Sequence, residues 1–253
     1  MDIPQLPVEL ITEIISTVWH MPLSRTERIT FMRSSALVNS TWADIFDLIS
    51  SRDVHIPSAA FCEHFIQRLH IQPSAIAPPS VFRTLLNLLQ GSAKPSLHPA
   101  RSANLACRSL TIQIINAEVH PSKGGHMRLT MGGVLDSLLE TLDAWSLAPN
   151  LRRLSIEYLD TGFDDIFDRD ALAALPLQIS HLDVRYTFSV GMPTWLVESL
   201  RKKQERRRHF VWKAPGVTRL SVIGAGKNTI GDLLVSCSNV QTVDGECSSV
   251  SQA

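Results

Sequence analysis

A short phrase recurs three times in the second half of the chain. Residues 149–156 read PNLRRLSI, residues 177–184 read LQISHLDV, and residues 215–222 read PGVTRLSV. The last four residues of each copy alternate between polar and apolar, which is the period of a strand with one buried face. The phrase therefore predicts three equivalent strands whose aliphatic side chains enter one shared core.

Segments with apolar residues at helical spacing separate these strands. Helical patterns cover residues 134–142, 172–177 and 195–200, and two further strand patterns cover residues 110–114 and 239–243. Strands that alternate with helices are typical of a parallel α/β sheet. We therefore expect a parallel sheet with helical return segments.

The recurring phrase resembles the strand of a leucine-rich repeat, Leu-x-x-Leu-x-Leu, with a helix on the return. This resemblance implies a solenoid, in which each strand–helix unit buries its apolar face against the next unit. The intervals between the strands vary from about 20 to about 45 residues, whereas regular repeats run about 20 to 29, so the repeat would be a degenerate one. An ordinary doubly wound α/β sheet fits the same alternation and stays open.

The polar residues of the phrase face away from the predicted core. Period-2 alternation arranges them in two rows across neighbouring strands: Arg153, His181 and Arg219 in the first, and Ser155, Asp183 and Ser221 in the second. The first row would be a basic stripe, suited to an acidic or phosphorylated segment of a target protein. A solvated row that binds nothing is the alternative.

Two stretches near the N-terminus have the pattern of short amphipathic helices. Residues 6–15 read LPVELITEII, where Pro7 suits the first helical turn and Glu9 complements the positive end of the helix dipole. Residues 36–42 read ALVNSTW and begin a second apolar stripe that runs to about Ser51. Helices this short bury too little surface alone, so either the remaining chain or a partner must cover them.

Together these two stretches resemble an F-box, in its fungal F-box-like form: Leu-Pro-x-Glu-Leu, a pair of aliphatics one turn later, and a Leu-Val-x-x-x-Trp helix. The resemblance implies docking on a Skp-type adaptor and, through it, on a cullin. The docking residues would be Leu6, Pro7, Leu10, Ile11, Ile14, Leu37, Val38 and Trp42. Trp42 would be the anchor, because Trp dominates interface hot spots.

Between these stretches the segment 19–33 is long and defines a middle helix poorly. An ordinary helical hairpin packed on its own core is the alternative.

We therefore expect an α+β or α/β protein with an all-α module over residues 1–52 and a leucine-rich-repeat-like domain over residues 53–253. The implied function is non-catalytic: the substrate receptor of a cullin–RING, SCF-type ubiquitin ligase that captures a protein target. Two other functions stay open. One is a small-molecule enzyme on a doubly wound sheet, and the other is a nuclear interaction protein that uses the basic run 201–208.

Charge and cysteine usage limit the binding partners and the cellular location that the sequence predicts. The 253 residues carry a formal net charge of +0, so no overall field favours nucleic acid or an anionic membrane. The sequence has no signal-peptide pattern and no apolar run that would span a bilayer. The four cysteines are scattered without a paired pattern, which favours free thiols in the cytoplasm or nucleus.

Three local patterns suggest chemistry but lack essential residues. Residues 224–229 read GAGKNT, yet Ser221 occupies the place of the first Gly of a phosphate-binding loop and Asn228 that of its hydroxyl. The aspartates of residues 160–170 lack the Gly and final Glu of an EF-hand loop. The segment Cys62–His64 has no second pair of metal ligands. We expect no cofactor and no metal.

Overall fold

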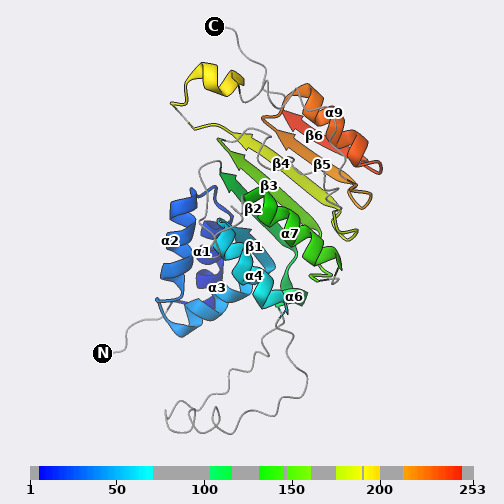
Figure 1. Ribbon diagram of the computed structural model, residues 1–253. Coiled ribbons are helices and arrows are strands. Elements are labelled where there is room, and N and C mark those ends of the chain that lie inside the picture. The colour runs from blue at the N-terminus through cyan, green and yellow to red at the C-terminus, as the bar shows by residue number, and fades with distance from the viewer. Residues whose placement is uncertain are drawn as a thin grey trace, which may run out of the picture.

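The computed structural model of the protein describes residues 6–70, 103–115, 131–144, 147–160, 175–189, 191–199 and 213–246. It is a mixed α/β structure built on a six-stranded parallel sheet (Figure 1). The strands are β1 (Asp53–Ile56), β2 (Ser109–Ile115), β3 (Arg153–Leu159), β4 (His181–Thr187), β5 (Arg219–Ile223) and β6 (Thr242–Glu246).

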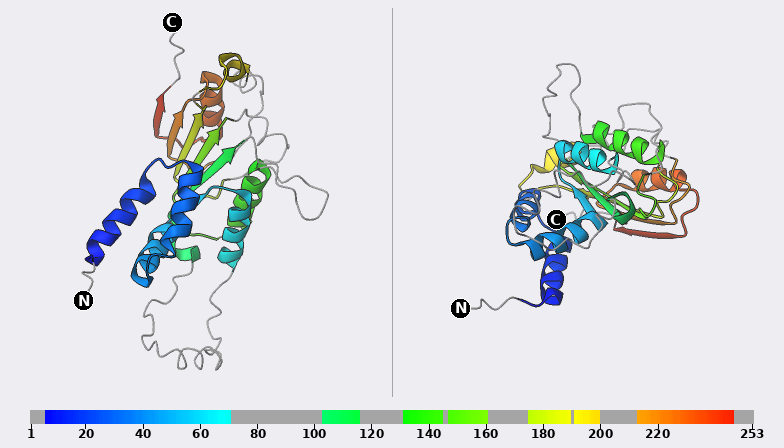
Figure 2. Two further views of the ribbon diagram at one scale, coloured as in Figure 1. Left: turned by 90° about the vertical axis from the view of Figure 1, so that its left-hand side faces the viewer. Right: turned by 90° about the horizontal axis from the view of Figure 1, so that it is seen from below.

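The strands follow one another across the sheet in the order of the chain, β1-β2-β3-β4-β5-β6. Three helices, α4 (Ala59–His70), α7 (Met131–Ala144) and α9 (Lys227–Ser236), cover one face of this sheet (Figure 2). The short helix α6 (Ala103–Ala106) precedes β2. A doubly wound sheet needs a point at which the strand order reverses. The described strands have no such point, so their arrangement departs from that alternative.

The apolar rows of the repeated phrase form the core between the sheet and these helices. Leu154, Leu182 and Leu220 are register partners and are 0% exposed. The next row contains Ile156, Val184 and Val222, which are at most 3% exposed. Strands with one buried face alternate in this way because successive side chains point to opposite faces. The three predicted strands and their shared core are therefore confirmed.

Three further helices lie beside β1 at the edge of the sheet (Figure 1): α1 (Val8–His20), α2 (Arg25–Ser35) and α3 (Ser40–Arg52). We call them the N-terminal helices. Pro7 immediately precedes α1, and Glu9 lies in its first turn, where a negative charge complements the helix dipole. Asn39 caps α3, because its Oδ1 accepts a hydrogen bond from the Trp42 N–H at 2.8 Å.

Helix α2 is the element that the sequence pattern failed to define. Its start is a capping box: the Ser24 hydroxyl accepts from the Glu27 N–H, and the Glu27 carboxylate accepts from the Ser24 N–H at 2.8 Å. The spacing Ser-x-x-Glu is a known signal for a helix start and could have revealed it. The apolar residues of segment 81–89 also predict a helix, and segment 122–126 has the pattern of a loop. Both segments, and the basic run 201–208, lie outside the described residues.

Candidate functional site

Helix α1 has an apolar arc that is wider than the contact it makes. Its inner side contributes Ile11, Ile15 and Trp19, which are at most 7% exposed. Leu10 and Ile14 lie one turn apart beside them and are 46% and 42% exposed. The protein therefore covers only part of the apolar surface of this helix.

The turn into α3 also leaves apolar side chains uncovered. Leu37 is 84% exposed and Val38 is 55% exposed, and Leu6 before α1 is 55% exposed. Helix α3 has no fully buried residue, although Trp42, Ile45, Phe46 and Ile49 give it an apolar face. Large aliphatic side chains left in water on short helices are typical of a docking surface when they gather in one region.

The eight residues expected to contact an adaptor do not all reach the surface. Leu6, Pro7, Leu10, Ile14, Leu37 and Val38 are exposed. Ile11 is 7% exposed, so it packs inside the protein and supports this surface from below. Trp42 is half-buried, and its Nε1 is shielded from solvent with no hydrogen-bond partner among the described residues. An anchoring role for Trp42 would therefore require its indole to move.

Buried Trp19 and Arg28 attach the N-terminal helices to the sheet. The Trp19 Nε1–H donates to the Asp53 carbonyl of β1 at 2.7 Å, and the indole contacts the His55 ring edge-on at 4.9 Å between centroids. The Arg28 guanidinium donates to the carbonyls of Trp19 and Met21 at 2.8 and 2.9 Å and lies 5.2 Å from the Trp19 ring centroid. A cation suits these carbonyls because they end helix α1.

A charged side chain as buried as Arg28 carries an electrostatic cost. Burial lowers its pKa, and the carboxylate of Glu157 on β3 partly offsets this effect. Glu157 also accepts a hydrogen bond from Gln113 Nε2 at 2.9 Å. Sequence reasoning did not single out Arg28 or Gln113. Both are polar residues that usually lie at the surface, and no local sequence pattern indicates that they are buried here.

The open face of the sheet carries the two predicted polar rows. Arg153 is the register partner of His181, which is the partner of Arg219. In the same way Ser155 pairs with Asp183 and Asp183 with Ser221. The predicted alignment of these six residues on one face therefore agrees with the strand register, whereas their role in binding stays a prediction.

The first row is less basic than the sequence pattern indicated. The Arg153 Nε donates to Asp183 Oδ2 at 2.5 Å, and the Arg219 Nη2 donates to Asp244 Oδ2 at 3.0 Å. Each arginine is thus matched by an aspartate of the next strand: Asp183 belongs to the second row, and Asp244 is the register partner of Ser221 in that row. Sequence reasoning treated the rows separately and overlooked Asp244, although its place on β6 follows from the same alternation. Two of the three residues of the first row are therefore in ion pairs, which reduces the basic character that the sequence pattern predicts.

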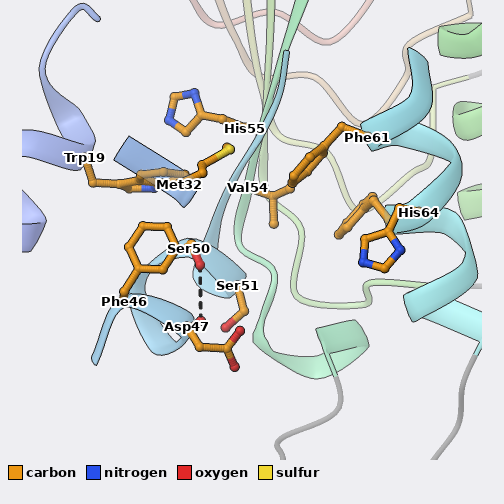
Figure 3. Close-up of a pocket in the computed structure, with 11 residues that line it drawn as sticks. Trp19, Met32, Phe46, Asp47, Ser50, Ser51, Val54, His55, Phe61 and His64 are labelled. Carbon is orange, nitrogen blue, oxygen red and sulfur yellow. Dashed lines mark hydrogen bonds between the residues drawn. The ribbon is translucent and has the colours of Figure 1, made fainter. Parts of the chain in front are cut away.

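A small cavity lies where the N-terminal helices meet β1 and α4. It has a volume of about 210 Å³, and its walls include Trp19, Phe46, Val54, Phe61 and Phe65 (Figure 3). Figure 3 shows His55 on the side of Trp19 and Met32, and Val54 on the side of Phe61. Burial first, and then the charges of Arg28 and His20, lower the pKa of His55 to about 3. The cavity is smaller than the ~300–1,000 Å³ of typical ligand pockets.

The GAGKNT segment is a tight turn between β5 and α9. Gly224 has a φ of +76°, and a Cβ at this position would lie 2.3 Å from the Tyr186 carbonyl oxygen. Thr229, the hydroxyl residue next to Asn228 in the sequence, is 3% exposed and so is not available to a ligand in this turn. This geometry accounts for the glycine without a ligand.

The three cysteine thiols in the described part of the chain are buried. Burial raises the pKa of Cys62 and of Cys107 to about 12 and that of Cys237 to about 11. Thiols with such pKa values stay protonated at neutral pH and are poor nucleophiles. The described residues hold no cluster of three or more side chains suited to a metal ion. Among the described helices, none is both long and apolar enough to cross a membrane.

Comparison with known proteins found no match to the chain among protein-family models, curated proteins or solved structures.

Proposed function

We propose that the protein is an F-box-like substrate receptor: the N-terminal helices dock on a Skp-type adaptor, and the sheet domain presents a target to a cullin–RING ubiquitin ligase. The observation that carries the proposal is the exposure of five apolar side chains on the N-terminal helices and their turns: Leu6, Leu10, Ile14, Leu37 and Val38. These residues belong to the two stretches that resemble the F-box pattern. An apolar helix face laid against a partner is a common mode of protein recognition.

The architecture of the remaining chain supports the same proposal. All neighbouring strands are parallel and follow the chain order, and the return helices lie on one face, as in a leucine-rich-repeat-like solenoid. On the opposite face, Arg153 and Arg219 are exposed and available to a protein target. The rows of Arg153, His181 and Arg219 and of Ser155, Asp183 and Ser221 would read that target through polar contacts.

Binding to a purified Skp-type adaptor tests the proposal. We expect the full chain to bind at micromolar concentration and Leu10→Asp to lose that binding, because a carboxylate on the apolar surface would be desolvated without a partner. The free protein should tolerate this substitution, since Leu10 is 46% exposed. Circular dichroism would check that the variant remains folded.

Thr12→Asp is the matched control on the same helix. Thr12 is exposed and lies about half a turn around α1 from Leu10, away from the apolar surface. This variant adds the same charge and should bind the adaptor as the wild type does. Absence of wild-type binding, or equal binding by Leu10→Asp, would reject the proposed function.

A further inference from the structure

The two edges of the sheet differ in what covers them. At the β1 edge, Trp19 of α1 donates a hydrogen bond to the Asp53 carbonyl, so the chain itself covers this edge. Strand β6 forms the other edge, and no described strand pairs with its outer side. A strand at an edge presents unpaired backbone groups that can form a ladder with another chain.

The register shows which groups of β6 are free. The Thr242 N–H donates to the Thr218 carbonyl before β5, and Thr242 is the register partner of Arg219. Alternate residues of a strand in a parallel ladder direct both backbone groups to the same neighbour. Thr242 and Asp244 therefore face β5, and Val243 and Gly245 direct their N–H and C=O groups outward.

The apolar core also ends uncovered at this edge. Val243 occupies the same row as Leu182 and Leu220, yet it is 47% exposed while they are 0% exposed. On α9, Leu234 is 38% exposed and Val235 is 81% exposed. Stacked strand–helix arrays expose an apolar layer at an end that no further unit covers. A covering chain would thus place an apolar side chain beside Val243.

On the open face of the sheet, Asp244 indicates a second property of a chain that would cover this edge. Arg219 binds Oδ2 of Asp244, and no described residue donates to Oδ1 of this carboxylate, whose side chain is 59% exposed. In the preceding strands, Asp183 accepts both from Arg153 and from Ser155. Both partners of Asp183 lie on the strand before it. A basic side chain on an added strand would instead approach Asp244 from the other side, where it could bind the exposed carboxylate.

We propose that the outer edge of β6 binds an extended segment of another protein as an added strand, with apolar residues on the helix side alternating with basic residues on the open side. Backbone hydrogen bonds to Val243 and Gly245 supply affinity, and Val243 and Asp244 select the alternating side chains. The proposal rests on the geometry of this edge and not on adaptor docking, so Leu10→Asp leaves it intact.

A fluorescein-labelled seven-residue peptide of alternating lysine and valine is the probe. We expect it to bind the full chain and to slow the amide hydrogen exchange of Val243 and Gly245. Two versions carry N-methyl groups either on all valine or on all lysine nitrogens. Only one edge of the peptide pairs with β6, so one version should bind at least about tenfold more weakly and the other normally, because two or more net hydrogen bonds are lost.

Val243→Lys should weaken peptide binding by at least about tenfold, because it replaces the apolar contact with a charge at the edge. Ser238→Lys is the matched control, since Ser238 is exposed before β6 and the substitution adds the same charge. Several outcomes would overturn the proposal: no peptide binding at millimolar concentration, equal effects of the two N-methylated peptides, or equal effects of the two lysine substitutions. Slow exchange of both amides without peptide would also overturn it, because the chain itself or a second copy would then cover the edge.

Discussion

His55 illustrates how the environment of a single residue determines its charge. It lies on β1 beside the Trp19 ring, and its pKa is lowered from 6.5 to about 3. Burial is the main cause, because it penalises the charged imidazolium, and electrostatic interactions with Arg28 and His20 lower the pKa further. The folded protein therefore holds His55 neutral at pH values where an unfolded chain would protonate it.

This difference predicts an acid-sensitive stability. Between pH 6.5 and about 3 the unfolded chain binds a proton at His55 that the folded chain does not bind, so the free energy of unfolding falls as the pH falls through this window. We expect His55→Gln to lose less stability than the wild type between pH 7 and pH 4, by on the order of 2–3 kcal/mol. Urea unfolding of both proteins at the two pH values measures it. Equal losses would show that His55 titrates normally in the folded protein.

The connection between β5 and α9 shows how one element depends on another that is distant in the sequence. Gly224 adopts a positive φ, and the carbonyl of Tyr186 on β4 lies where a side chain would begin. The turn therefore brings α9 onto the sheet only if this position has no Cβ. By contrast, a Cβ added at Gly231 within α9 would have no atom within 4 Å.

Alanine at these two glycines should have opposite effects. Gly224→Ala should destabilise the protein by at least about 2 kcal/mol, because it combines an unfavourable φ with a backbone clash. Gly231→Ala should stabilise it by up to about 1 kcal/mol, because alanine favours a helix over glycine. Denaturant unfolding monitored by circular dichroism compares the pair. A neutral Gly224→Ala would mean that the turn can adopt another conformation.

At the scale of the whole molecule, Trp19 links the N-terminal helices to the sheet. Its ring packs edge-on against Phe46 of α3 and His55 of β1, and its Nε1–H donates to the Asp53 carbonyl. The carbonyl lies on the side of β1 that no described strand covers. The indole thus satisfies a backbone group that would otherwise be left without a partner at a buried edge.

Trp19→Phe tests this link, because it keeps a ring and removes the donor. We expect a loss of about 2 kcal/mol in the free energy of unfolding, since the Asp53 carbonyl remains shielded without a hydrogen bond. Trp195→Phe is the control: Trp195 is 70% exposed, and its substitution should be nearly neutral. If the two substitutions have equal effects in urea unfolding, the hydrogen bond of Trp19 does not couple the two parts of the molecule.

The alternation of side chains along the strands could be predicted from the sequence alone. Leu154, Leu182 and Leu220 are buried, and Arg153, His181 and Arg219 align on the other face, because a strand has a strict period of two. The apolar surface of α1 followed from helical spacing, although the pattern did not distinguish buried Ile11 from exposed Leu10.

Only the tertiary structure decided which strands are neighbours and which polar residues meet. The order of the sheet, the burial of Arg28 beside Glu157 and the pairing of Arg219 with Asp244 all join residues that are distant in the chain. Local periodicity reports the environment on either side of a segment, because it arises from the geometry of that segment alone. It contains no information about which segment lies alongside. For this reason the sequence pattern predicted a basic stripe, whereas Arg153 and Arg219 form ion pairs with Asp183 and Asp244 of the neighbouring strands.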